Sequence, residues 1–358
     1  MKSEKTDELN REKVVYKRNS NYELLRIVAM CGVIILHYCG YGGAVEYAQN
    51  EFWNLRFLRF MQSICSCCVD LFLMISGYFL CTTDKRSLKK IILLFIQVIL
   101  FNMSFYLGSA FFGINKFDTR EFLIFCVPDN YFVVMYSALY ILSPYINIIL
   151  NNLNKEQLKR FVFSYFIIFS MWDCFVDLTG SVFRIEWRGL STISVQGSQN
   201  GFNIVNFVTI YLIASYIRKT RLKVECKKLV WGIAALVFAI YAWSSIEYKM
   251  EWTSISKSYD NPLVILLATA VFLLLSNISF SSKLINELAR ASFTCFLFHQ
   301  PFMAYIGVKK AVQNNFGTMS AHLMISVIML YFVSYAVYKI YDYGMKIVSR
   351  VIKVAQQN

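Results

Sequence analysis

Long apolar runs are the sequence feature that most restricts how this chain can fold. Of its 358 residues, 57% are hydrophobic and 16% are charged, and the hydrophobic residues gather into continuous stretches. Each stretch has roughly the 20 residues that a helix needs to cross a bilayer, whereas a transmembrane β-barrel would show short segments of alternating polarity. The sequence therefore predicts an all-α, polytopic transmembrane helix bundle with about ten spans, near residues 23–43, 58–81, 90–112, 130–150, 160–178, 202–218, 229–247, 262–278, 291–309 and 321–346.

The distribution of basic residues predicts the orientation of these spans. With the N-terminus inside, the cytoplasmic segments hold 25 of the 36 Lys and Arg residues and the outer connections hold 10. Such an excess is typical of cytoplasmic loops, so we expect both termini inside and an even number of spans. We expect a disordered cytoplasmic tail at 1–20, a transmembrane domain at 21–350 and a second cytoplasmic tail at 351–358. The net charge of +14 then reflects topology, and no nucleic-acid partner is expected.

The first apolar run, 21–43, carries two polar residues at informative positions. Arg26 lies near its start and His37 lies eleven positions later, in its second half. At about 100° per residue, the two side chains point to nearly the same side of a helix, roughly 16 Å apart along its axis. A cation at the rim and an imidazole deep in the membrane favour a path that leads from one surface to a reaction centre.

Two further polar residues are expected at a similar depth. Counted from the cytoplasmic ends of their spans, His37 lies roughly 20 Å deep, Asp70 roughly 17 Å and Asn102 roughly 18 Å. Our hypothesis is that His37 acts as a general base and that Asp70 orients it and stabilises its charged form. The alternative is a structural polar contact between helices. A covalent intermediate on His37 is also compatible with the sequence.

Other polar groups allow both a functional and a structural interpretation. The basic hairpin Lys85-Arg86-Ser87-Leu88-Lys89-Lys90 either only sets topology or also binds the phosphates of an anionic cofactor. His299, two residues before Pro301, either binds substrate or caps a helix kink, and His322 is expected to be structural.

The outer connections and the cysteines give weaker signals. The connection at 179–201 either covers an outer opening or is an ordinary loop. Asp173 and Asp177, one helical turn apart, either bind sugar hydroxyls or mark the membrane interface. The ten cysteines show no repeated Cys-x-x-Cys pairs at metal-binding spacing, so we expect no metal site. The cluster at 65–68 is expected to pack as small residues in a helix, and the alternative is metal or redox chemistry.

Four stretches of sequence, spread over nearly the whole chain, form a recognisable pattern. They are NYELLRIVAMCGVIILHY in the first span, VDLFLMISGYFL at Val69–Leu80, YSALYILSPYIN at Tyr136–Asn147 and FTCFLFHQPF at Phe293–Phe302. In order and spacing they resemble the acyltransferase 3 family of bacterial integral-membrane acyltransferases.

The resemblance implies transfer of an acyl group, usually acetyl from acetyl-CoA, to a carbohydrate hydroxyl at or across the plasma membrane. It places the family's Arg/Lys-x10-His motif on Arg26 and His37, with His37 in the catalytic position. The family's Arg-x-x-Arg motif, associated with the acyl donor, falls on Arg86 and Lys89, where lysine keeps the charge but loses the bidentate fork. We therefore expect acetyl-CoA as donor, bound by Arg26, Arg86 and Lys89.

The expected protein is thus a multi-pass O-acyltransferase of the bacterial plasma membrane. Its expected partners are acyl-CoA, membrane lipids and a glycan acceptor, either a cell-surface or exported polysaccharide or its lipid-linked precursor. Asn102 and His299 are candidate substrate contacts. The alternatives are a polytopic transporter or flippase of lipid-linked sugars, and a sensor or structural membrane protein. The sequence shows neither matched halves nor internal repeats, which argues against a transporter of that kind.

Overall fold

The structure, a computed structural model, describes residues 19–83 and 85–355. Over those residues it is helical without any β-strand, which confirms the predicted all-α class. The predicted tail at 1–20 lies outside the described residues except for Asn19 and Ser20, and so do residues 356–358. The last helix continues to Ala355, so the first part of the predicted second tail is helical.

The helices follow one another with short connections. In chain order they are α2 (Ser20–Cys39), α3 (Ala44–Tyr47), α4 (Phe52–Cys65), α5 (Cys68–Leu80), α6 (Leu88–Phe111), α7 (Thr119–Phe125), α8 (Tyr131–Asn152), α9 (Lys155–Phe166), the π-helical η1 (Ile167–Trp172), α10 (Asp173–Phe183), the 3₁₀ turn η2 (Gln199–Gly201), α11 (Ile204–Thr220), α12 (Cys226–Met250), α13 (Pro262–Ser276), α14 (Lys283–Leu288), the 3₁₀ turn η3 (Ala289–Ala291), α15 (Ser292–Phe302), α16 (Val308–Val312) and α17 (Phe316–Ala355).

Side chains that cap helix N-termini explain where many helices begin. Such a side chain accepts a hydrogen bond from a backbone N–H that has no partner within the helix. Asn154 and Gln157 form a reciprocal capping box at the start of α9, and Asn261 precedes Pro262 at the first position of α13. The same kind of cap is made by Asp118, Asn130, Asn203 and Ser282.

Within the described residues, seven helical segments are long and apolar enough to cross a membrane. They are Ser20–Cys39, Phe52–Leu80, Leu88–Phe111, Tyr131–Asn152, Lys155–Phe183, Cys226–Met250 and Phe316–Val351. The other three predicted spans coincide with the shorter helices α11, α13 and α15, of 17, 15 and 11 residues. The chain is therefore a multi-pass membrane protein by its helices, while the number of ten spans and the orientation remain predictions.

The ninth predicted span, 291–309, does not form a single helix. α15 ends at Phe302, one residue after Pro301, and a turn follows up to Gly307. Proline supplies no backbone N–H to the helix, and Gly307 has a φ of 76°, which other residues rarely adopt. The chain therefore leaves the helix here and enters the short α16.

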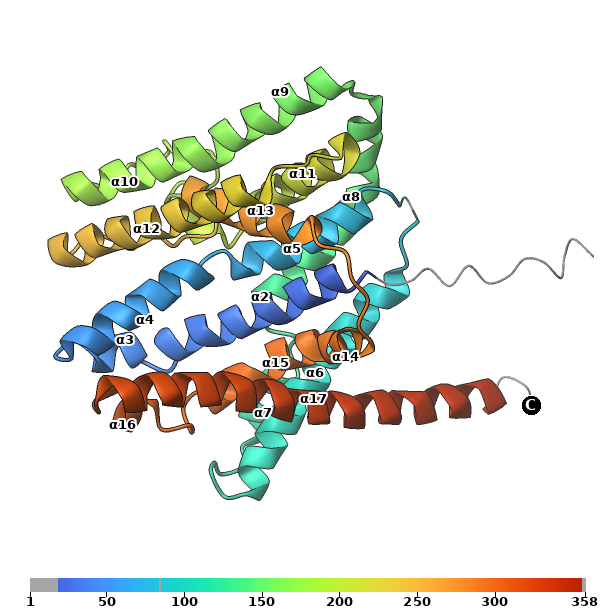
Figure 1. The fold of residues 1–358 in the computed structure, drawn as a ribbon. Helices are drawn as coiled ribbons and strands as arrows, with labels where there is room; N and C mark the ends of the chain where they lie inside the picture. The colour runs from blue at the N-terminus through green and yellow to red at the C-terminus, as the bar shows by residue number, and fades with distance from the viewer. Residues whose placement is uncertain (1–18, 84, 356–358) are drawn as a thin grey trace, which may run out of the picture.

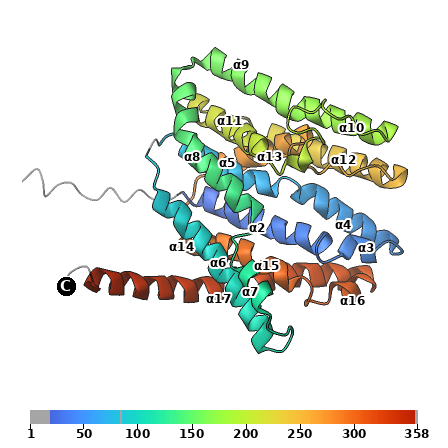
Figure 2. The ribbon, with the colours of Figure 1, turned by 180° about the vertical axis from the view of Figure 1, so that it is seen from behind.

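Most helices lie side by side around α2, which packs against α4, α5, α13, α15 and α17 (Figure 1). α9 and α10 lie on one side of this bundle and α17 on the other, and α6 with α7 crosses it obliquely (Figure 2). We call the end where α2 begins the terminal end, because α17 also finishes there. The opposite end, where α2, α10 and α12 finish, is the loop end.

A close approach at Gly32 fixes the position of α2 against the junction of α4 and α5. A Cβ atom at this position would lie 2.1 Å from the sulfur of Cys68 and 3.5 Å from that of Cys65. Only glycine fits that spacing without a shift of its neighbours. Cys65, Cys67 and Cys68 are buried here, as their predicted packing role requires.

We expect Gly32→Ala to lower the apparent melting temperature in detergent, because the added methyl overlaps the Cys68 sulfur and overpacking costs about 1–3 kcal/mol. Gly32→Ala combined with Cys68→Ala should recover part of the loss. The control is Gly232→Ala on α12, where a Cβ meets nothing within 4 Å and helix propensity predicts a small gain. Equal shifts for the two glycine variants would contradict this account of the α2 contact.

Candidate active site

Two histidines from distant parts of the chain form a hydrogen-bonded pair. His37 Nδ1 lies 2.8 Å from His299 Nε2, and the two rings are stacked with centroids 4.7 Å apart. His299 is fully buried, whereas His37 keeps some exposed surface. The pair exists because α2 packs against α15 with both residues in the last turns of their helices.

The hydrogen bonds of the pair decide which nitrogens carry protons. His299 Nδ1 lies 2.8 Å from the backbone oxygen of Cys295, which can only accept, so this nitrogen donates. When both rings are neutral, His299 Nε2 must then accept from the Nδ1–H of His37. The remaining nitrogen of His37, Nε2, keeps its lone pair and is the atom that can take a proton from a substrate.

A cavity lies along the side of α2 that carries Arg26. Its volume is about 250 Å³, and its lining includes Arg26 and Val33 of α2, Phe132 of α8 and Arg290 near the start of α15. Phe296 also lines it, and the ring centroid of Phe296 lies 6.4 Å from that of His299. The cavity thus has two cations and the carboxylate of Glu23 among its lining groups, and apolar walls near Phe296, although neither histidine lines it.

Residues 19–339 of the chain match a family model described as an acyltransferase domain. The chain belongs to the acyltransferase 3 family. The resemblance predicted from four stretches of sequence is therefore confirmed over nearly the whole chain. Searches among curated proteins and among solved structures found no match.

Arg26, expected in this acyltransferase at the rim of a path to His37, lines the cavity but is not a lone cation. Its Nη1 lies 2.7 Å from both carboxylate oxygens of Glu23, one helical turn away. Glu23 is nearly buried, while about 30% of the Arg26 side chain is exposed. Arg290, which the sequence-based predictions omitted, is half-exposed at the same cavity and forms an ion pair with Glu287 at 3.5 Å.

His299 was predicted either to bind substrate or to cap a helix kink, yet it is the partner of the His37 ring. The sequence gives little signal for this pairing. His37 lies near the end of its apolar run, whereas His299 lies near the middle of the predicted span 291–309. His322 is structural, as predicted, since its ring nitrogens lie 2.9 Å from the Tyr38 hydroxyl and 2.8 Å from the Ile306 carbonyl oxygen.

Asp70 does not hold the ring of His37, contrary to the prediction. It is completely buried, and neither of its carboxylate oxygens has a hydrogen-bond partner among the described residues. Its polar neighbours are Asn206 of α11 and Asp260. Burial raises the pKa of Asp260 to about 7. Helix rise gives the depth of a side chain but not its direction, and Asp70 is directed toward α11 because α5 packs against α11 as well as α2.

The hairpin after α5 uses its arginine for structure. Arg86 donates from Nη2 to the Leu80 carbonyl at 3.0 Å and from Nε to the Ser143 hydroxyl at 2.8 Å, which ties the end of α5 to α8. Lys89 is exposed on the first turn of α6. Asn102 donates to the Val127 carbonyl at 3.3 Å and so supports the turn before α8. These contacts bring none of the three residues to the histidine pair.

We expect Asp70→Asn to leave the melting temperature unchanged or to raise it. Asparagine has nearly the shape of aspartate and adds an N–H donor, and the buried Oδ1 of the neighbouring Asn206 also lacks a partner.

The matched control for this variant is Asp173→Asn. Asp173 is equally buried, but it accepts hydrogen bonds from Ser191 and from the hydroxyl and backbone N–H of Thr192. Loss of these bonds should cost about 1–3 kcal/mol. Similar destabilisation by both variants would mean that the Asp70 carboxylate has a partner that stabilises its charge.

Proposed function

We propose that this protein is a membrane O-acyltransferase that moves an acyl group, expected to be acetyl, from acyl-CoA to a hydroxyl of a glycan. The observation that carries the proposal is the His37–His299 pair, with His37 Nε2 left as an acceptor. A cavity lined by Arg26 and Arg290 lies nearby, and its Phe296 ring lies next to the ring of His299. Family membership supports the acyltransferase class. The donor, the acceptor and the base are parts of the proposal.

In the proposed reaction, His37 Nε2 removes the proton from the acceptor hydroxyl as its oxygen attacks the thioester carbonyl. The new C–O bond forms, the C–S bond breaks, and the coenzyme A thiolate leaves with the proton that His37 had taken. During the step His37 carries a positive charge, which its Nδ1–H shares with His299 through their hydrogen bond. His299 is a positioning residue, because the Cys295 carbonyl fixes its tautomer.

The location of both histidines supports a base that becomes transiently positive. Each lies in the last turn of its helix, where the free carbonyl groups carry partial negative charge. Such a helix end stabilises a cation by about 0.3–1 kcal/mol. Here the ends of both α2 and α15 lie beside the His37–His299 hydrogen bond.

For the donor, we propose that the terminal end faces the cytoplasm of a bacterial cell, as the excess of basic residues favours. The phosphates of acyl-CoA would bind at Arg26 and Arg290, close to the N-terminus of α15. Its long thiol-bearing arm would follow the apolar cavity for the roughly 16 Å between Arg26 and His37. Lys89 remains a candidate phosphate contact, while Arg86 is proposed to contribute mainly through the fold.

We expect His37→Ala to reduce acyl transfer by about 10²–10⁴-fold with normal membrane insertion, because the general base is lost. His299→Ala should lower kcat by a smaller factor without changing the KM for acyl-CoA. Coenzyme A release and product acylation, measured in proteoliposomes with acetyl-CoA, check both. His322→Ala, a change to the third histidine of the chain, is the control. A transporter would keep its activity in His37→Ala and consume no thioester, and that result would contradict the proposal.

We expect Arg290→Gln to raise the KM for acetyl-CoA by about tenfold, because one charged hydrogen bond to a phosphate is lost. The melting temperature should change little. Arg86→Gln should do the reverse and mainly lower the melting temperature, because it frees the Leu80 carbonyl. Lys283→Gln, in the same segment as Arg290 but outside the cavity, controls for loss of surface charge. Selective loss of donor affinity in Arg86→Gln would reverse this assignment.

A further inference from the structure

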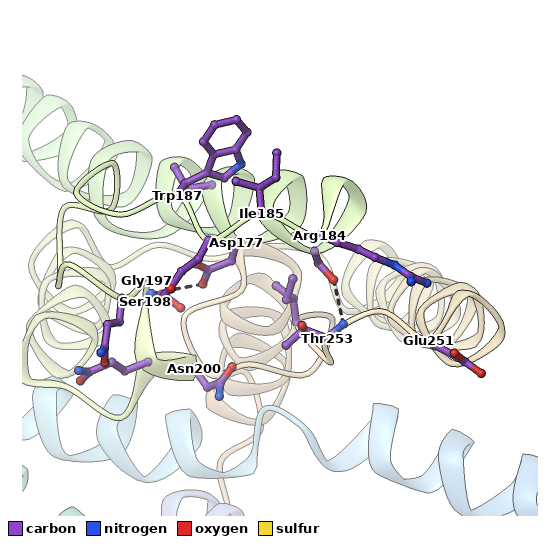
Figure 3. Close-up of a pocket in the computed structure, with 16 residues that line it drawn as sticks. Asp177, Arg184, Ile185, Trp187, Gly197, Ser198, Asn200, Glu251 and Thr253 are labelled. Carbon is purple, nitrogen blue, oxygen red and sulfur yellow. Dashed lines mark hydrogen bonds between the residues drawn. The ribbon is translucent and has the colours of Figure 1, made fainter.

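A larger cavity lies at the loop end of the bundle, among helices other than those that carry the histidines. It has a volume of about 660 Å³ and is lined by the second half of α10, the connection after α10 and the connection after α12. We call it the loop-end pocket. Asp177 lies near its middle, with Trp187 and Ile185 on one side and Asn200 on the other (Figure 3).

Hydrogen bonds, some of them to a fully buried carboxylate, hold the two connections in place. Asp173, fully buried at the start of α10, accepts from Ser191 at 2.5 Å and from the Thr192 backbone at 2.8 Å. The backbone N–H of Thr253 donates to the Ser181 hydroxyl at 2.8 Å, which joins the walls from α10 and from the connection after α12 (Figure 3). The pocket is therefore built by the fold rather than left between loose loops.

The backbone of the pocket is also held in an uncommon conformation. Gln199 and Asn200 both line it and have consecutive left-handed φ values of 56° and 53°. Residues other than glycine rarely adopt this conformation, and they keep it where surrounding contacts impose it. Asn200 is fixed in this way, since its side-chain oxygen accepts from Ser258 at 3.0 Å and its carbonyl accepts from the Tyr259 backbone at 3.1 Å.

The chemistry of the lining suits sugar rings. Amide, hydroxyl and carboxylate groups can exchange hydrogen bonds with ring hydroxyls, and an indole offers an apolar face. Acidic side chains outnumber basic ones, which disfavours phosphorylated or uronic-acid chains and favours neutral or amino sugars. The groups concerned are Gln196, Gln199, Asn200, Ser181, Thr253, Asp177, Glu186, Glu251, Arg184 and Trp187.

The loop-end pocket and the histidine pair lie toward the same end of the bundle. His37 is in the last turn of α2, which finishes at the loop end together with α10 and α12 (Figure 1). The connection after α12 links the two regions, because its Lys257 donates to Gln62 of α4 at 2.9 Å. α4 in turn packs against α2. One extended ligand can therefore approach both regions from one side of the membrane.

We propose that the loop-end pocket binds sugar units of an oligomeric or polymeric glycan, neutral or amino-bearing, while another unit of the same chain is acylated at His37. This inference rests on the proposed acyltransferase function and names its acceptor class. The loop-end pocket is then a glycan-binding site separate from the site of acyl transfer at His37. The acceptor is then a chain of several sugars rather than a free monosaccharide.

The test compares acceptor lengths in a variant that lacks two lining groups. Trp187→Ala removes the indole, and Gln199→Gly removes an amide while glycine suits the left-handed backbone. Trp53→Ala and Gln49→Ala together are the matched control, because both residues are exposed at the loop end outside the pocket. The acceptors are de-O-acetylated fragments of the surface glycan of the cell that encodes the protein, with one sugar or with six or more.

For the long fragment, we expect the double variant to raise KM by about tenfold at unchanged kcat, since uniform binding is lost. For the one-sugar fragment and for the control variant, we expect no change. Equilibrium binding of the labelled long fragment to His37→Ala protein, with and without the pocket substitutions, should show the same tenfold loss without turnover.

The outcomes separate the two proposals. Equal KM values of the wild type for short and long fragments, or a pocket variant that behaves like its control, would overturn the inference and leave the acyltransferase intact. No transfer to any fragment in the wild type, with retained binding that depends on the pocket, would instead remove the proposed reaction and keep the glycan site. No binding of the long fragment to the wild-type or His37→Ala protein would overturn the inference.

Discussion

The hydrogen bond between His37 and His299 is the interaction on which the arrangement of the site depends. Polar rings inside a membrane bundle need partners, because an unsatisfied polar group there costs several kcal/mol. Here the requirement is met by a short series in which His37 donates to His299 and His299 donates to the Cys295 carbonyl. The series fixes both rings and leaves a single acceptor nitrogen. It also requires α2 and α15 to stay packed together, and the contact at Gly32 holds α2 against α4 and α5 from another side.

Periodicity predicted the helices that carry the site, but not the pairing of His37 with His299. The apolar runs predicted the helices, and Arg26 and His37 do lie in one continuous helix, so their eleven-residue spacing puts them toward one side of α2. Arg26 lines the cavity there, whereas His37 does not. The spacing depends only on the geometry of one helix, so it needed no knowledge of how helices pack. The capping side chains before α8, α9, α11 and α13 likewise indicate where these helices begin, because capping depends only on local hydrogen bonds.

Predictions that required knowledge of helix packing were less successful. Asp70 was assigned to His37 by depth, but rotation about α5 directs it toward Asn206. Arg86 matched a donor-binding motif by sequence, yet its guanidinium donates hydrogen bonds to the Leu80 carbonyl and the Ser143 hydroxyl. A motif records which residue types recur, and it does not separate a ligand contact from a contact that shapes the loop. Arg290 was missed because its role depends on where α15 meets α2, which no local pattern reveals.

The position of His37 along α2 has a consequence for the kind of acceptor that the enzyme can use. His37 lies 17 residues after Ser20, or roughly 26 Å along a helix in a hydrocarbon core of about 30 Å. With the terminal end toward the cytoplasm, as proposed, the thioester would cross most of the membrane before it reaches the base. The acceptor would then need to present only one hydroxyl near the opposite surface. A bulky polymer satisfies that condition without entering the bilayer, provided that another part of the protein holds it there. The polar loop-end pocket, lined by α10 and the connections after α10 and α12, has the location and chemistry for such a contact.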